Sequence, residues 1–148
     1  CKDWPEGAKL IGGIFSGHPW GCGNTCAVKV ESPDHPVNAA FDGQGFWIND
    51  EIYDHRGGPE RASSRILLSL DMGEPQNQLV PWAKRKQING RTDFPIAWLR
   101  RHGEGRVFYC SLGHQRSTYW SPRVLQPYLD GIRYSVARTG KLRKRRRE

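Results

Sequence analysis

One stretch, Gly105–His114, constrains the fold of this chain most strongly. Val107–Leu112 is a short apolar run with β-branched and aromatic side chains, which is typical of a core strand in a parallel sheet. A glycine ends the run, and His114 follows it. Because ligands of open α/β sheets bind just beyond the carboxyl ends of strands, this position favours His114 as a functional residue. The alternative is a loop histidine that only hydrogen-bonds nearby backbone.

The segments around this strand predict an α/β fold. After a polar loop, apolar side chains recur at helical spacing over residues 122–138, and Pro122 suits the first turn of that helix. Arg65–Leu70 indicates a second core strand. The other expected elements are a helix within Trp4–Phe15, a loop over Ser16–Thr25, strands at Ala27–Glu31, Gly45–Ile48 and Pro95–Arg101, a hairpin-like pairing of the last of these with the Gly105 strand, and an irregular excursion over Gly73–Thr92. One C-terminal helix and a partial helix at the start are too few to cover both faces of such a sheet. We therefore expect this chain to be the C-terminal portion of a larger α/β domain.

The net charge of +8 is concentrated in the last residues. Residues 140–148 carry six basic side chains against one Glu, which is +5 of that charge. We expect residues 139–148 to form a solvated, disordered basic tail. Nucleic-acid binding through this tail is a weaker alternative, because no aromatic residues for base stacking are interleaved with it. A mean hydropathy of −0.72, and the lack of any apolar run near about 20 residues, predict a soluble chain without a membrane partner.

The four cysteines do not predict a metal site by their spacing. His18, Cys22 and Cys26 follow one another at intervals of four, but Pro19 and nearby glycines forbid a regular helix there. A zinc site usually shows two paired ligand sets, and no second pair is present. Cys110 lies inside the apolar strand and is expected to be a small buried side chain. This cysteine usage fits a reducing compartment and slightly favours the cytoplasm.

Aromatic residues accompany two of the candidate site segments. His18 lies close to Trp20 in a Gly-rich loop, and an indole beside an imidazole suits a sugar, whose C–H face packs on aromatic rings. The alternative makes Trp20 a core side chain and His18 a hydrogen-bonded spacer. Tyr119 and Trp120, in the loop after His114, are expected to line the same cleft as substrate-binding residues.

An acidic pair follows the strand at Gly45–Ile48. Adjacent strand residues point to opposite faces, so only one of Asp50 and Glu51 is expected to face the site. We assign that position to Glu51, with Tyr53 on the same side by a period of two. The alternative for Glu51 is a salt bridge to one of two nearby arginines, Arg56 or Arg61.

The polar ends of three strands are expected to meet at one edge of the sheet. The strand ends at Glu51, Asp71 and His114 would converge there if the strands are neighbours, and His18 would join them from a loop. Asp71 is a candidate substrate-binding residue, although it could equally cap the following turn. The His18, Glu51 and His114 set could carry acid–base chemistry or hold one divalent metal, and the sequence does not choose between the two.

Motifs spread over residues 3–137 occur in one order and resemble those of a known family. They are Asp3-Trp4-Pro5, Leu10 to Trp20 (LIGGIFSGHPW), His35-Pro36-Val37, Asp50-Glu51-Ile52-Tyr53, Leu67 to Asp71 (LLSLD), Pro95-Ile96-Ala97-Trp98, Gly105 to Tyr109 (GRVFY), Ser111-Leu112-Gly113-His114 and Gly131-Ile132-Arg133-Tyr134. Together they resemble the C-terminal portion of the trehalose-utilisation (ThuA-like) domain, here residues 1–138. The resemblance implies the flavodoxin-like, class I glutamine amidotransferase-like three-layer α/β sandwich, with the N-terminal strands of that fold missing from this chain.

The resemblance also implies a role in carbohydrate metabolism, on trehalose or on keto-disaccharides and glycosides. The substrate expected is a small-molecule sugar, the reaction is acid–base chemistry by a hydrolase, lyase or isomerase, and no cofactor is assigned, with a divalent metal left open. Glutaminase chemistry is not expected, since Cys22 has Gly on both sides but follows no expected strand. The alternative function is a non-catalytic carbohydrate-binding or partner-docking module. Strand edges left exposed by missing strands would favour self-association.

Overall fold

The computed structural model describes residues 4–137, apart from the side chains of residues 82 and 83. A five-stranded sheet with the order β3-β2-β5-β6-β7 forms its centre, and β1 pairs with β4 in a separate two-stranded ribbon. The strands are β1 (Ile14–Trp20), β2 (Thr25–Val30), β3 (Phe46–Asn49), β4 (Ile52–Arg56), β5 (Ser64–Leu70), β6 (Pro95–His102) and β7 (Gly105–Cys110). The helices are α1 (Pro5–Ile11), α2 (Pro75–Gln78), α3 (Trp82–Ile88) and α4 (Pro122–Val136), with short 3-10 turns η1 (Pro36–Phe41) and η2 (Arg116–Trp120).

Every pair of neighbouring strands in the described residues is antiparallel. The parallel sheet expected from the two apolar strands is therefore wrong for this part of the chain. A continuous apolar run indicates that a strand is buried on both faces, and it carries no information on the direction of its neighbours. The expected hairpin of β6 and β7 is present, with His102 opposite Gly105.

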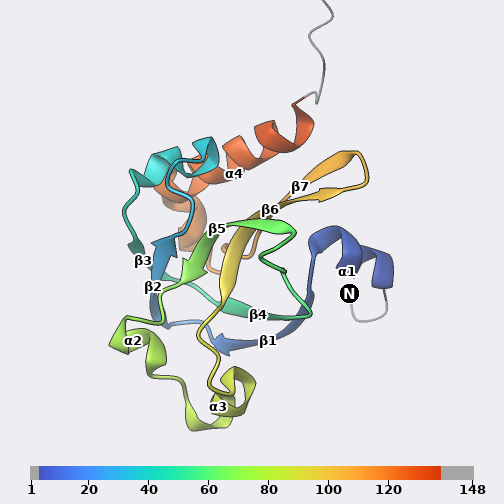
Figure 1. The fold of residues 1–148 in the computed structure, drawn as a ribbon. Coiled ribbons are helices and arrows are strands. Elements are labelled where there is room, and N and C mark those ends of the chain that lie inside the picture. Colours follow the sequence, from blue (N-terminus) through green and yellow to red (C-terminus); the bar gives the residue numbers. More distant parts are fainter. Residues whose placement is uncertain (1–3, 138–148) are drawn as a thin grey trace, which may run out of the picture.

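Two different layers cover the sheet. Helix α4 and η1 lie on one face, and the β1–β4 ribbon lies on the other (Figure 1). Side chains of β7 alternate between these layers, as the period of two requires. Phe108 packs against Tyr128 of α4, whereas Tyr109 contacts His55 of β4. The layer that covers the second face of the sheet, which the sequence analysis did not identify, is thus a two-stranded ribbon instead of a helix.

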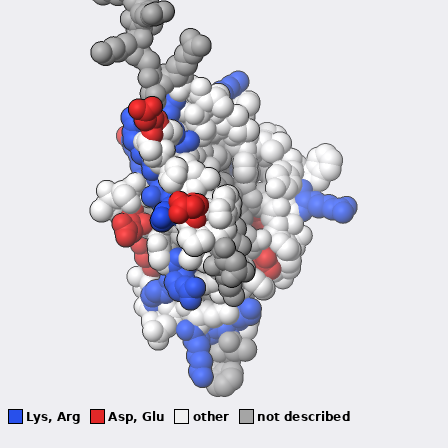
Figure 2. Space-filling view, turned by 90° about the vertical axis from the view of Figure 1, so that its right-hand side faces the viewer, with Lys and Arg blue, Asp and Glu red and all other residues white. Residues whose placement is uncertain are grey.

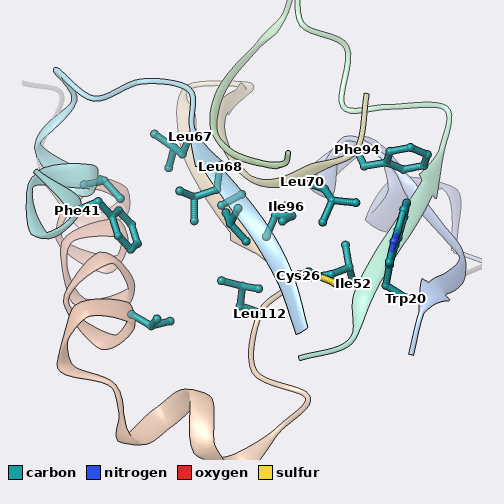
Figure 3. Close-up of a cluster of buried hydrophobic side chains, with 14 of the residues drawn as sticks. Trp20, Cys26, Phe41, Ile52, Leu67, Leu68, Leu70, Phe94, Ile96 and Leu112 are labelled. Atoms are coloured by element: carbon teal, nitrogen blue, oxygen red, sulfur yellow. The ribbon is translucent and has the colours of Figure 1, made fainter. Parts of the chain in front are cut away.

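The core continues from α4 through the sheet to the ribbon. Figure 3 shows Phe41 beside the helices at one end, Leu70 and Ile96 in the middle, and Trp20 with Phe94 at the other end. Phe41, Leu70 and Ile96 are each 0% exposed. At about 25 cal/mol per Å² of apolar surface, such a core supplies the main driving force for folding.

Several expected boundaries shift in the structure. The helix expected within Trp4–Phe15 ends at Ile11, where Gly12 takes the left-handed conformation, and β1 then occupies the first half of the expected loop. The expected excursion over Gly73–Thr92 contains α2 and α3. Pro122–Val136 is helical, as expected, and the tail 139–148 lies outside the described residues. No helix in the described part of the chain is long and apolar enough to cross a membrane.

The charge on the surface is mixed in sign. On the face shown in Figure 2, lysine and arginine side chains are interspersed with acidic and uncharged residues. Several of the arginines are neutralised by defined partners; Arg61, for example, binds Asp93 at 2.6 Å and Glu31 at 3.1 Å. The basic character of this chain therefore does not form a continuous patch on that face.

Candidate functional site

Three side chains from distant parts of the sequence meet at the edge of the sheet. Glu51 lies between two imidazoles, with its Oε1 3.1 Å from Nδ1 of His18 and its Oε2 3.3 Å from Nδ1 of His114. The carboxylate side chain is 11% exposed, whereas the two histidines are 41% and 42% exposed. The structure thus brings together the three residues that the sequence analysis proposed as catalytic.

Asp50 anchors the loop that carries His114. Its carboxylate is 0% exposed and accepts hydrogen bonds from the backbone amides of Gly113, at 2.6 Å, and Gln115, at 2.9 Å. The hydroxyl of Thr118 donates to the same carboxylate at 3.0 Å. The alternation expected at this acidic pair is present: Asp50 is directed at the loop after β7, and Glu51 at the histidines. A fully buried carboxylate needs such donors, because an unpaired one would be costly to desolvate.

His18 belongs to β1 and approaches Glu51 from the ribbon. Its Nδ1 atom is shielded from solvent and makes no hydrogen bond, because the short distance to Glu51 Oε1 lacks hydrogen-bonding geometry. The ring stacks on Phe15 with 6.4 Å between centroids. A shielded polar nitrogen without a hydrogen-bond partner is unusual in a folded protein.

Cys22 is a fourth polar side chain of this site. It lies in the tight turn Gly21–Asn24, which is closed by a hydrogen bond from the amide of Asn24 to the carbonyl of Gly21 and has a positive φ at Gly23. The thiol donates to Oε1 of Glu51 over 3.9 Å. The expectation that Cys22 follows no strand is wrong, since β1 ends two residues before it. The Gly-Pro content of β1 hid the strand from a period-two analysis.

Tyr53 lies at the margin of the site. Its ring meets Phe15 edge-on at 5.0 Å between centroids. Burial raises the pKa of the Tyr53 phenol first, and the negative charges of Glu51 and Asp50 raise it further. The phenol therefore remains a neutral hydrogen-bonding group near Glu51, as a substrate-binding residue on the same side would.

Trp20 and Asp71 are placed elsewhere, against expectation. Trp20 is 1% exposed, donates its indole N–H to the carbonyl of Asn77 at 2.8 Å and packs on Phe94, so it offers no surface to a ligand. The alternative that Trp20 is a core residue is correct. Asp71 accepts a hydrogen bond from the amide of Gly73 at 3.0 Å, which is the turn-capping alternative.

The two aromatic residues of the loop after β7 face a different surface. Tyr119 packs with its hydroxyl against Gly113, and it lines an open groove of about 710 Å³ with Trp120 and the outer side of α4. Trp120 is 83% exposed. The expected common cleft is thus divided: the histidines and Glu51 form one site, and the aromatic groove runs along α4.

The sequence analysis missed the contributions of two residues, Asp50 and Cys22, to this site. The sequence analysis gave Asp50 no role, although three hydrogen bonds from Gly113, Gln115 and Thr118 to its carboxylate hold the His114 loop against Glu51. Cys22 was judged by its spacing to Cys26, which is 1% exposed and whose pKa is raised to about 11 by burial and then by Asp50. The glycines that flank Cys22 were the available signal, because they indicate a tight turn that exposes its thiol.

Comparisons with known proteins agree on one family. The family model of ThuA, described as trehalose utilisation, matches residues 1–135. No curated protein matches the chain. A crystal structure of a ThuA-like protein from Bacteroides uniformis aligns with a TM-score of 0.65 at 22% sequence identity. That alignment covers 89% of this chain and 51% of the other, so this chain spans about half the length of the structure it matches.

Proposed function

The chain belongs to the ThuA family, described as trehalose utilisation, and from this premise we propose that it acts on a sugar by acid–base chemistry at Glu51, His18 and His114. The substrate class we propose is trehalose or a keto-disaccharide or glycoside. One observation carries the proposal: a nearly buried carboxylate lies between two half-exposed imidazoles, within 3.1 and 3.3 Å.

The orientation of the two imidazoles supports a division of roles in this proposal. Both histidines turn Nδ1 toward Glu51, which leaves Nε2 of each ring as the nitrogen available to a sugar. Glu51 can then stabilise, by its charge, an imidazolium that forms during proton transfer. One neutral imidazole would take a proton from a sugar hydroxyl or from a carbon next to a keto group. The other, when protonated, would supply a proton to the oxygen on which charge develops.

This chain covers only about half the length of the structure it matches, which raises the question of which part of the family domain it represents. We infer that residues 1–138 correspond to the C-terminal portion of the longer family domain; the 51% coverage of the Bacteroides uniformis protein supports a match to part of that protein's length. The parallel strands of a flavodoxin-like sandwich would then have to belong to the remaining part, since the described strands here pair antiparallel.

Calorimetric titration tests the proposed function. The purified protein, with its folding verified by circular dichroism, is titrated with a panel of disaccharides and with their 3-keto forms. Each titration is made once in buffer that contains a metal chelator and once in buffer with added zinc or manganese. We expect a keto-sugar to bind in at least one of these conditions, and Glu51→Gln to weaken that binding. A folded protein that binds no sugar in any condition would overturn the proposal.

A second function, docking of a ligand or partner without catalysis, is favoured by the groove along α4. Trp120, Leu129 and Ile132 are 83%, 44% and 58% exposed there, which is a large apolar surface for a small chain. Sugar binding that survives the double variant His18→Ala, His114→Ala but is lost in Trp120→Ala would favour this function over acid–base chemistry.

A further inference from the structure

We propose that Cys22, Glu51 and His114 form a zinc-binding site. This inference deepens the proposed function, because it gives the same cluster a metal, but the metal binding itself requires no sugar. It starts from one observation: one potential ligand atom from each of these three residues lies within 4.8 Å of the other two.

The distances suit a tetrahedral ion. Donor atoms around a tetrahedral zinc ion lie roughly 3.5 Å apart, because they are held about 2.0 to 2.3 Å from the metal. Here Cys22 Sγ lies 3.9 Å from Glu51 Oε1, and His114 Nδ1 lies 3.3 Å from Glu51 Oε2. One ligand atom from each residue lies within 4.8 Å of the other two, so side-chain rotations would have to close the longest separation by about 1 Å to bring all three donors onto one ion.

The chemistry of the donors selects zinc over magnesium or calcium. A thiolate and an imidazole are borderline-to-soft ligands, whereas Mg²⁺ and Ca²⁺ take oxygen ligands almost entirely. Three protein ligands are also the usual number in catalytic zinc sites, which keep a further position for water or substrate. Zinc would thus use the thiol that the acid–base proposal leaves without a role.

Backbone contacts hold the ligands in place in the absence of metal. The amides on both sides of His114 donate to Asp50, and the Gly21–Asn24 turn presents Cys22. Glu51 is fixed next to Asp50 by its own amide, which donates to the Asp50 carboxylate at 2.9 Å. Such outer contacts orient metal ligands and reduce the entropy lost when the ion binds.

His18 completes the arrangement. Its shielded Nδ1 makes no hydrogen bond and lies 3.1 Å from the carboxylate that would bind zinc. It is available as a fourth ligand or as the proton-transferring group next to the ion. If zinc binds, Cys22, Glu51 and His114 would hold it, the ion would supply a Lewis acid for a sugar oxygen, and proton transfer would be left to His18.

Cobalt(II) substitution tests the site without any sugar. The metal-free protein is titrated with Co²⁺ under reducing conditions and then with Zn²⁺ in competition. We expect a single equivalent to bind with a thiolate-to-cobalt charge-transfer band and intense visible bands of tetrahedral cobalt, all displaced by zinc. Cys22→Ser should abolish the charge-transfer band and weaken zinc binding by about 100-fold or more. Cys26→Ala, which removes a buried thiol, is the matched control and should leave the band unchanged.

The outcomes separate this inference from the proposed function. Absence of metal binding, or a charge-transfer band that persists in Cys22→Ser, overturns the zinc site even if the protein binds a keto-sugar. A band that depends on Cys22, Glu51 and His114 supports the site even if every sugar fails to bind, and that failure would count against the proposed function alone. Circular dichroism of each metal-free variant distinguishes loss of a ligand from loss of the fold.

Discussion

Asp50 holds His114 by the backbone on both sides of it: the carboxylate accepts the amide of Gly113 at 2.6 Å and the amide of Gln115 at 2.9 Å. The two contacts join the end of β3 to the loop after β7, which lies 63 residues later in the chain. They place the His114 ring against the carboxylate of Glu51, the residue next to Asp50. The relative position of two candidate catalytic residues therefore depends on a third side chain, which binds backbone amides next to both.

Replacing Asp50 should destabilise the protein through the loop that carries His114, while the hydrophobic core keeps its own contacts. In Asp50→Asn the new amide keeps one acceptor and places two N–H donors against the donors of Gly113, Gln115 and Thr118. We expect a loss of about 2 to 4 kcal/mol in the free energy of unfolding, measured in urea, because hydrogen bonds to a buried charge are replaced by unpaired donors.

The half-buried turn residue Asp71 is the control for this prediction. Asp71→Asn removes one charge-assisted contact, to the amide of Gly73, and should cost less than about 1 kcal/mol. Equal losses for the two variants would show that the Asp50 contacts do not stabilise the loop.

Loss of His114 should affect turnover far more than stability. The side chain is 42% exposed and is not part of the core, so His114→Ala should leave the unfolding transition within about 1 kcal/mol of the parent. Turnover of any keto-sugar that the protein processes should fall by about 10² to 10⁴, the usual contribution of a general acid or base. His102→Ala, at the exposed β6–β7 turn, is the matched histidine control. An unchanged rate in His114→Ala would remove this residue from the mechanism.

His55 makes the stability depend on pH. Burial lowers the pKa of His55 from 6.5 to about 4, against the opposing charge of Asp54, and its Nε2 lies 2.9 Å from the Tyr109 hydroxyl. As the pH is lowered, the His55 imidazole takes up a proton near pH 6.5 in the unfolded chain but only near pH 4 in the folded protein. Stability is therefore fully present above pH 6.5 and falls as the pH is lowered toward 4, by about 2 to 3 kcal/mol from this group.

The His55 contribution can be isolated by difference. Urea unfolding of the parent and of His55→Gln is measured between pH 7 and pH 4, where glutamine keeps a hydrogen-bonding group near Tyr109 and does not titrate. The difference in free energy of unfolding between the parent and His55→Gln should narrow as the pH falls, because only the parent loses the stability that comes from its unprotonated His55. Parallel curves over the whole range would contradict the prediction.

Gly131 should not tolerate alanine, although it lies inside α4. Alanine at an exposed helical position is about 1 kcal/mol better than glycine. At position 131, however, the added methyl would collide with the ring of Phe108 on β7. We expect Gly131→Ala to lower the melting temperature, and Gln126→Ala on the exposed side of the same helix to leave it nearly unchanged. A rise in melting temperature for Gly131→Ala would show that the helix can move away from the sheet.

Local patterns in the sequence predicted the elements that depend on local information. Strand β5, the β6–β7 hairpin and α4 lie close to their expected residues, because a period of two or of 3.6 follows from the backbone alone. The missed strands, β1 and β4, pair with register shifts around Gly17 and Trp20, so their side chains do not alternate regularly. A bulged ribbon of this kind leaves no clear period in the sequence.

The sequence by itself determined which residue types are present at strand ends, and that was enough to propose His18, Glu51 and His114 as neighbours. Only the tertiary structure decided the direction of the strands, the burial of Trp20, and the approach of Cys22 to Glu51 over 3.9 Å. These features depend on contacts between segments that are far apart in the chain. Such contacts are fixed by packing against the whole core, and the local preferences of the residues involved do not contain them.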